Sequence, residues 1–88
     1  MELQEYRKEI DRIDRALVEL FCQRMAVCAG VAAWKQERNL PVLDQSREDA
    51  KLDAIAQMAG PEMAPYCQAL YRTIFEQSRA YQQRLMEK

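Results

Sequence analysis

The sequence predicts an all-α protein of three helices per chain: one long N-terminal helix, one short helix and one of medium length. In each segment the apolar residues recur every three or four positions, which is the period of a helix face. The residues that interrupt helices are sparse and grouped around positions 39–41 and 60–65. We therefore expect helices over about 3–38, 44–59 and 62–86, in a single domain spanning residues 1–88.

The predicted first helix carries one stripe along its whole length. Its members, spaced alternately by three and four residues, are Leu3, Tyr6, Ile10, Ile13, Leu17, Leu20, Arg24, Val27, Val31 and Trp34. Such a helix is about 54 Å long, whereas a compact domain of this size is only about 31 Å across. Because one chain cannot cover that stripe, we expect a homodimer with interlocked long helices.

The second and third helices show shorter patterns. Asp44 or Ser46 can cap the second helix, and Gly60 can end it. The inward positions of the second helix read Glu48, Leu52, Ile55 and Ala59. For the third helix the predicted buried positions are Met63, Tyr66, Cys67, Leu70, Ile74 and Tyr81, and Ser78 and Gln82 prolong the line from Leu70 to Ile74.

Composition argues against several classes of function. The formal net charge of −1 provides no basic field, so we expect no nucleic-acid partner. No uninterrupted apolar run approaches the roughly 18 residues of a membrane span, and the N-terminus lacks the basic and apolar blocks of a signal peptide. These features predict a cytoplasmic protein with no membrane partner.

Histidine is absent, which removes the commonest general base and the commonest metal ligand. A Ser-His-Asp or Cys-His mechanism is therefore excluded. The odd set Cys22, Cys28 and Cys67 contains no CxxC pair, so we interpret these residues as reduced, packed thiols and assign them no role. Without histidine, we expect no catalytic zinc.

Arg24 is the one charged member of the first-helix stripe. A buried charge costs several kcal/mol unless it is paired, so Arg24 requires a carboxylate across the dimer or an anionic ligand. Lys35 lies three turns further on, about 16 Å along nearly the same face. By itself, Lys35 also fits a surface lysine whose stem covers Trp34.

Other polar residues stand where they can join these cations. Asp44, Arg47 and Glu48 open the second helix, while Ser78 and Gln82 lie one turn apart on the third. Each fits an ordinary capping or surface role alone, but in a three-helix fold all can converge on one pocket. Arg7 lies 28 residues before Lys35, about 42 Å along the helix, so it can serve the pocket only from a second chain.

These positions resemble the all-α, type II chorismate mutases over roughly residues 6–83. The matching stretches are Y-R-K-E-I-D-R-I-D at 6–14, L-F-C-Q-R at 20–24, W-K at 34–35, P-V-L-D-Q-S-R-E at 41–48, and Ser78 with Gln82. The resemblance implies a cofactor-free Claisen rearrangement of chorismate to prephenate, in phenylalanine and tyrosine biosynthesis. It also implies a domain-swapped dimer with two shared sites.

The resemblance further implies a role for each matched residue. Arg24 and Arg7 of the second chain would bind substrate carboxylates, with Arg47 in support. Lys35 and Gln82 would donate to the ether oxygen, Glu48 and the backbone near Asp44 would hold the ring hydroxyl, and Ser78 would contact the ring-carboxylate end. Lys35, Gln82, Arg24 and Glu48 are thus the expected catalytic residues.

Two alternatives stay open. An isochorismate-pyruvate lyase on the same scaffold would reuse a similar set of cations, although the intact P-V-L-D-Q-S-R-E stretch favours the mutase. A non-catalytic dimerisation module would use Arg24 to fix the register of the helices. The short tails favour a free-standing enzyme, and docking to a regulatory pathway enzyme is compatible with the sequence.

Overall fold

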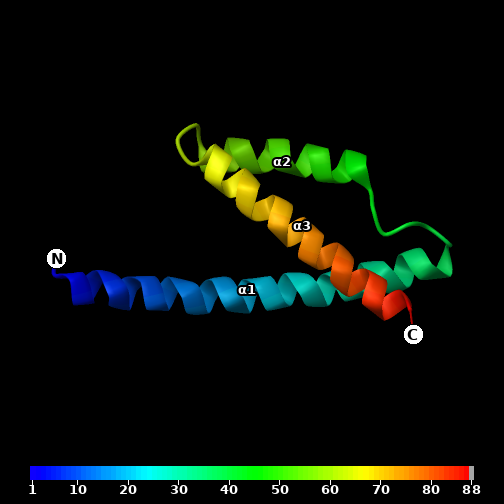
Figure 1. The fold of residues 1–88 in the computed structure, drawn as a ribbon, viewed down its shortest axis with the longest axis horizontal. Helices are drawn as coiled ribbons and strands as arrows, with labels where there is room; N and C mark the ends of the chain where they lie inside the picture. The colour runs from blue at the N-terminus through cyan, green and yellow to red at the C-terminus, as the bar shows by residue number, and fades with distance from the viewer. Residues whose placement is uncertain (88) are drawn as a thin grey trace.

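A computed structural model describes residues 1–87, which form three helices and no strand (Figure 1). They are α1 (Leu3–Glu37), α2 (Gln45–Ala59) and α3 (Ala64–Met86). The all-α prediction is confirmed, and each helix begins and ends within two residues of the expected position. The bounds agree because helix-breaking residues mark both turns clearly in the sequence.

Both turns are formed by the residues that the sequence indicates as helix caps and helix breakers. After α1, Asn39 adopts a left-handed conformation (φ 54°), which asparagine tolerates better than most residues. Asp44 caps α2, because its Oδ1 accepts a hydrogen bond from the backbone amide of Arg47 at 3.1 Å. Ser46 supports this cap by donating to the same oxygen. Gly60, with φ 82°, ends α2.

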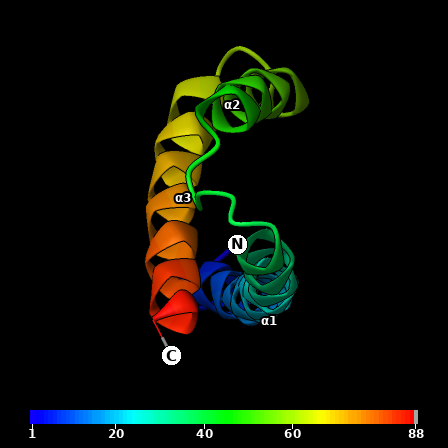
Figure 2. The ribbon, with the colours of Figure 1, turned by 90° about the vertical axis from the view of Figure 1, so that its right-hand side faces the viewer.

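The three helices form an open, elongated arrangement. In Figure 1, α3 runs diagonally from α2 to the C-terminal half of α1, and Figure 2 shows α1 and α2 at opposite ends of α3. The chain measures 54 × 28 × 14 Å, with a radius of gyration of 16.0 Å. A compact chain of this length would have a radius of gyration of about 12 Å. One chain therefore leaves much of α1 uncovered.

The buried core is small and lies where α3 meets its neighbours. Its apolar members are Ala32, Val42, Ile55 and Phe75, and its polar members are Ser78 and Gln82. Every large apolar residue of the α1 stripe is exposed. An apolar face of this length, left uncovered by its own chain, needs another surface to exclude water.

The predicted inward face of α3 is partly wrong for the single chain. Met63, Tyr66 and Leu70 are 49%, 68% and 53% exposed. The helix is rotated so that Phe75 and the two polar residues beyond it face α1 and α2. Periodicity shows which residues share a face, but it does not fix which of two adjacent stripes meets the rest of the chain.

By length and composition alone, α1 is also apolar enough to cross a membrane, although only 6% of its most apolar window is buried. A helix that covers its apolar face with another protein surface meets the same criterion. The expectation of no membrane partner stays a prediction.

Candidate active site

A cavity of about 200 Å³ lies between the C-terminal half of α1, the start of α2 and the C-terminal half of α3. Its walls include every predicted site residue of one chain except Arg7. These seven are Arg24, Lys35, Asp44, Arg47, Glu48, Ser78 and Gln82. Residues far apart in the sequence thus gather around one space.

Arg24 reaches this cavity from the middle of α1. Its guanidinium carbon lies 5.7 Å from the ring centroid of Phe75 and 5.9 Å from that of Tyr71, in cation–π range. One Nη atom is 3.7 Å from the sulfur of Cys28. Within residues 1–87, no carboxylate lies close enough to form an ion pair with Arg24. The charge is therefore available to an anion.

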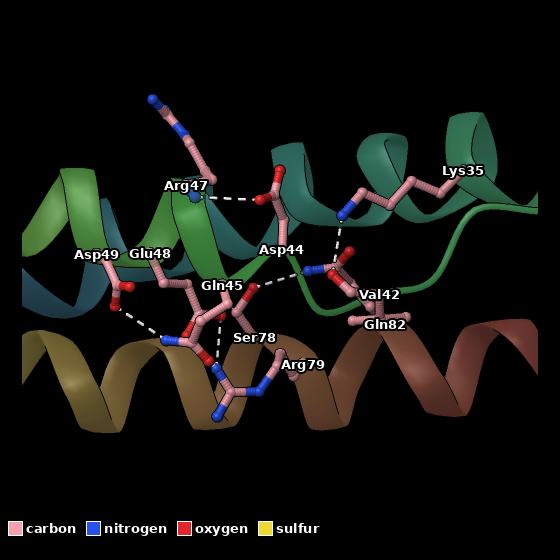
Figure 3. Close-up of polar contacts among 10 residues, drawn as sticks. All are labelled: Lys35, Val42, Asp44, Gln45, Arg47, Glu48, Asp49, Ser78, Arg79 and Gln82. Atoms are coloured by element: carbon pink, nitrogen blue, oxygen red, sulfur yellow. Dashed lines mark hydrogen bonds and ion pairs between the residues drawn. The ribbon is translucent and has the colours of Figure 1, made fainter.

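Lys35 stands at the other end of the α1 wall. Its Nζ donates a hydrogen bond to the carbonyl oxygen of Val42 at 2.8 Å (Figure 3). This bond ties the loop between α1 and α2 back onto α1. Because an ammonium group has three donors, Lys35 keeps donors for a ligand in the cavity.

Ser78 and Gln82 form the buried wall on α3, with 5% and 7% exposure. Gln82 Nε2 donates to Ser78 Oγ at 3.0 Å, and that hydroxyl donates to the sulfur of Cys28 at 3.1 Å. Gln82 Oε1 is buried and has no hydrogen-bond partner among the described residues. An unsatisfied buried oxygen costs about 1–3 kcal/mol, so Gln82 Oε1 is placed to accept a hydrogen bond from a donor that enters the cavity.

The rim of the cavity is formed by the first turn of α2. Asp44 is exposed there, and the backbone amide of Arg47, followed by the Ser46 hydroxyl, holds the pKa of its carboxyl below the ordinary value. The side chain of Arg47 is exposed, and Figure 3 shows its guanidinium directed away from Glu48 and Gln82. Arg47 thus lies at the entrance rather than inside.

Glu48 has a partner that the sequence did not indicate. Nη1 of Arg79, on α3, lies within hydrogen-bonding distance of both carboxylate oxygens of Glu48. Arg79 also lines the cavity. It was missed because the apolar line of the third helix left it among the polar surface residues, although it directly follows Ser78.

Arg7 is the one predicted site residue that lies elsewhere. It is exposed near the start of α1, about eight turns before Lys35. Nothing in one chain brings it to the cavity, which is the arrangement that the sequence led us to expect.

The cavity carries a surplus of positive charge. Its charged lining consists of four cations, Arg24, Lys35, Arg47 and Arg79, and two anions, Asp44 and Glu48. Within the part of the chain that the structure describes, no three His, Cys, Asp or Glu side chains cluster in a way that could hold a metal ion. The surplus of positive charge and the hydrogen-bond donors of this lining suit the binding and orientation of a polyanion.

This arrangement agrees with a sequence comparison. The model of the chorismate mutase type II family matches residues 6–83, which is nearly the whole chain. The chain belongs to the chorismate mutase type II family. The match includes all of α2, nearly all of α1 and α3, and every residue of the cavity.

Two curated relatives are similar to this chorismate mutase-family chain. The T-protein of Haemophilus influenzae is 38% identical over 52 residues, covering 59% of this chain and 14% of the relative. The bifunctional chorismate mutase/prephenate dehydratase of Buchnera aphidicola is 28% identical over 89 residues, covering 99% of this chain and 23% of the relative. The chain thus spans less than a quarter of the length of either relative. No solved structure matches it significantly.

Proposed function

We propose that this protein is a chorismate mutase, which converts chorismate to prephenate in the biosynthesis of phenylalanine and tyrosine. The observation that carries the proposal is the convergence of seven polar residues from all three helices on one cavity with surplus positive charge. Membership of the family supports the same activity, and so does the name of the Buchnera relative.

The chemistry suits these residues. The rearrangement breaks a carbon–oxygen bond and forms a carbon–carbon bond within one molecule, so it requires no nucleophile and no proton transfer. It requires the substrate to be held in its compact conformer. It also requires donors near the ether oxygen, where negative charge develops as the bond breaks. A cavity without histidine but rich in fixed donors meets both needs.

Each side chain then has a task that fits its position. Arg24, which has no carboxylate partner within residues 1–87, clamps one substrate carboxylate through its planar fork of donors. Lys35 and Gln82 donate to the ether oxygen. Glu48 accepts a hydrogen bond from the ring hydroxyl, with the backbone near Asp44 beside it.

Two further residues of the same chain act from the buried wall and from the rim of the site. Ser78 contacts the ring-carboxylate end, where Gln82 Nε2 already holds its hydroxyl. Arg47 supports a carboxylate from the rim, which requires its exposed side chain to turn inward when the substrate binds. No step uses a metal or a cofactor.

We further propose that the active form is a homodimer with interlocked long helices. An apolar groove of about 480 Å³ runs between α1 and α3 in one chain. Leu17, Leu20 and Leu70 line it and are each more than half exposed. A second α1 would fill this groove and cover the stripe. An antiparallel or crossed pairing would also bring Arg7 of the second chain to the cavity.

The rival functions make different predictions in one assay. Purified protein is added to chorismate, and its near-ultraviolet absorbance is followed; the assay is repeated with isochorismate while salicylate fluorescence is recorded. A mutase consumes chorismate and forms no salicylate. Salicylate from isochorismate would instead identify a lyase, and no loss of either compound at micromolar protein would favour a non-catalytic module.

The oligomeric state is tested separately by measuring the mass in solution. A dimer is expected at micromolar protein, and a monomer would overturn the role of Arg7. A cytoplasmic location, the absence of nucleic-acid and membrane partners, and docking to a regulatory pathway enzyme stay predictions.

A further inference from the structure

The ion pair between Arg79 and Glu48 is the strongest feature of the cavity that the proposed mechanism does not use. It joins the first turn of α2 to the C-terminal half of α3. One guanidinium nitrogen, Nη1, meets both carboxylate oxygens of Glu48. The carboxylate is therefore gripped symmetrically, and its orientation is set by a residue on another helix.

The pair is part of the cavity wall rather than the outer surface. The side chain of Glu48 is 18% exposed and that of Arg79 is 31% exposed, and both line the cavity. A carboxylate has about four acceptor positions, and Arg79 occupies only part of them. Glu48 can thus accept a further hydrogen bond from a ligand without breaking the ion pair.

The charges that line the cavity also indicate a role for Arg79. A dicarboxylate substrate brings two negative charges into a space that already holds Glu48 and Asp44. Within one chain, the four cations and two anions of the lining leave a surplus of two positive charges, and Arg7 of the second chain would add one more. Without Arg79, however, Glu48 would face the substrate carboxylates without its neutralising partner.

We propose that Arg79 is a positioning residue that acts through Glu48. It holds the carboxylate in the rotamer that accepts the ring hydroxyl of the substrate, and it offsets the repulsion between Glu48 and the substrate carboxylates. This inference rests on the proposed function, because it assigns the ring hydroxyl of chorismate to Glu48. Arg79 itself makes no contact with the reacting atoms.

An ordinary interhelical ion pair would look similar, so the test must separate positioning from stability. We would measure kcat/KM for chorismate, and Kd for prephenate by calorimetry, in a double-mutant cycle. The cycle consists of the wild type, Arg79→Met, Glu48→Gln and the double variant. Prephenate keeps the ring hydroxyl and both carboxylates, so binding gives a value even where turnover is too slow to measure.

If Arg79 acts by positioning Glu48, the effects of substituting the two residues should be coupled. Arg79→Met should lower kcat/KM by about 10- to 100-fold in the Glu48 background, but by no more than about twofold when Glu48 is already Gln. Arg79→Lys, which keeps the charge without the planar fork, should recover part of the loss. Arg72→Met is the matched control, because Arg72 is an exposed arginine two turns earlier on α3 and is not among the described residues that line the cavity.

Three results for the variants would overturn the inference. Equal losses in both backgrounds would mean that Arg79 acts on the fold or binds substrate directly. Activity of Arg79→Met within twofold of the wild type would mean that it has no role. If Arg79→Met does not fold, Arg79→Lys and Arg79→Gln replace it, and the absence of coupling in both would also refute the idea. Failure of the wild type to consume chorismate would refute the proposed function first, and the inference with it.

Discussion

Mixing two inactive variants tests whether each site is shared between two chains. Arg7 lies about 42 Å along α1 from Lys35, so no single small ligand can touch both in one chain. We therefore expect Arg7→Ala and Arg24→Ala to be inactive alone but to complement each other. The two variants are unfolded together, refolded as a 1:1 mixture and assayed with chorismate.

The size of the recovery follows from symmetry. In a heterodimer, one site combines an intact Arg24 with an intact Arg7 from the other chain, and the second site lacks both. Random pairing makes about half of the dimers heterodimeric, and each has one working site of two. The mixture should therefore show about one quarter of wild-type activity.

A chain with both substitutions provides the control. Mixed with either single variant, it can form no intact site, so no activity should return. If Arg7→Ala and Arg24→Ala also fail to complement each other, although mass measurement shows mixed dimers, the shared site is refuted. If Arg7→Ala alone keeps full activity, Arg7 has no part in the site.

Three further predictions concern residues of one chain. Arg24→Ala should lower kcat/KM by at least about 100-fold while the far-ultraviolet circular dichroism stays helical; loss of the helical signal would instead favour a role in dimer register. Lys35→Met should lower kcat by about 100- to 1000-fold. It should also lower the free energy of unfolding by about 1 kcal/mol, because the hydrogen bond to Val42 is lost. Unchanged turnover would remove Lys35 from the mechanism. Asp44→Ala should lower the thermal midpoint at neutral pH through loss of the helix cap. Folding lowers the pKa of Asp44 from 3.8, so the charged cap stabilises the fold fully above that pH and is lost as pH falls through the lower folded value. The thermal midpoints of the wild type and Asp44→Ala should therefore converge in acid. A difference between them that stays constant with pH would contradict this.

The sequence was most informative where chemistry and helix period coincide. Arg24 and Lys35 share a helix face three turns apart, and the structure places both on the wall of one cavity. Ser78 and Gln82 looked like a polar extension of an apolar line, and among residues 1–87 they are the buried polar residues. In each case an unusual residue type in a regular pattern carried the information.

The sequence was less informative about rotation and about pairs between helices. The rotation of α3 about its axis, which exposes Tyr66 and Leu70, depends on how the three helices pack together. Periodicity alone does not give this information. Arg79 was missed for a related reason, because its partner Glu48 lies 31 residues earlier on another helix. Only the three-dimensional arrangement shows that an arginine on the polar side of α3 completes the cavity.

The most direct test of the account is the product formed from chorismate. Purified wild-type protein in buffer containing a metal chelator is incubated with chorismate, and the mixture is analysed by nuclear magnetic resonance over time. We expect one prephenate for each chorismate lost, at a rate proportional to the protein concentration. Chorismate that persists at the spontaneous rate, with micromolar folded dimer present, would contradict the assignment of this cavity as a mutase site.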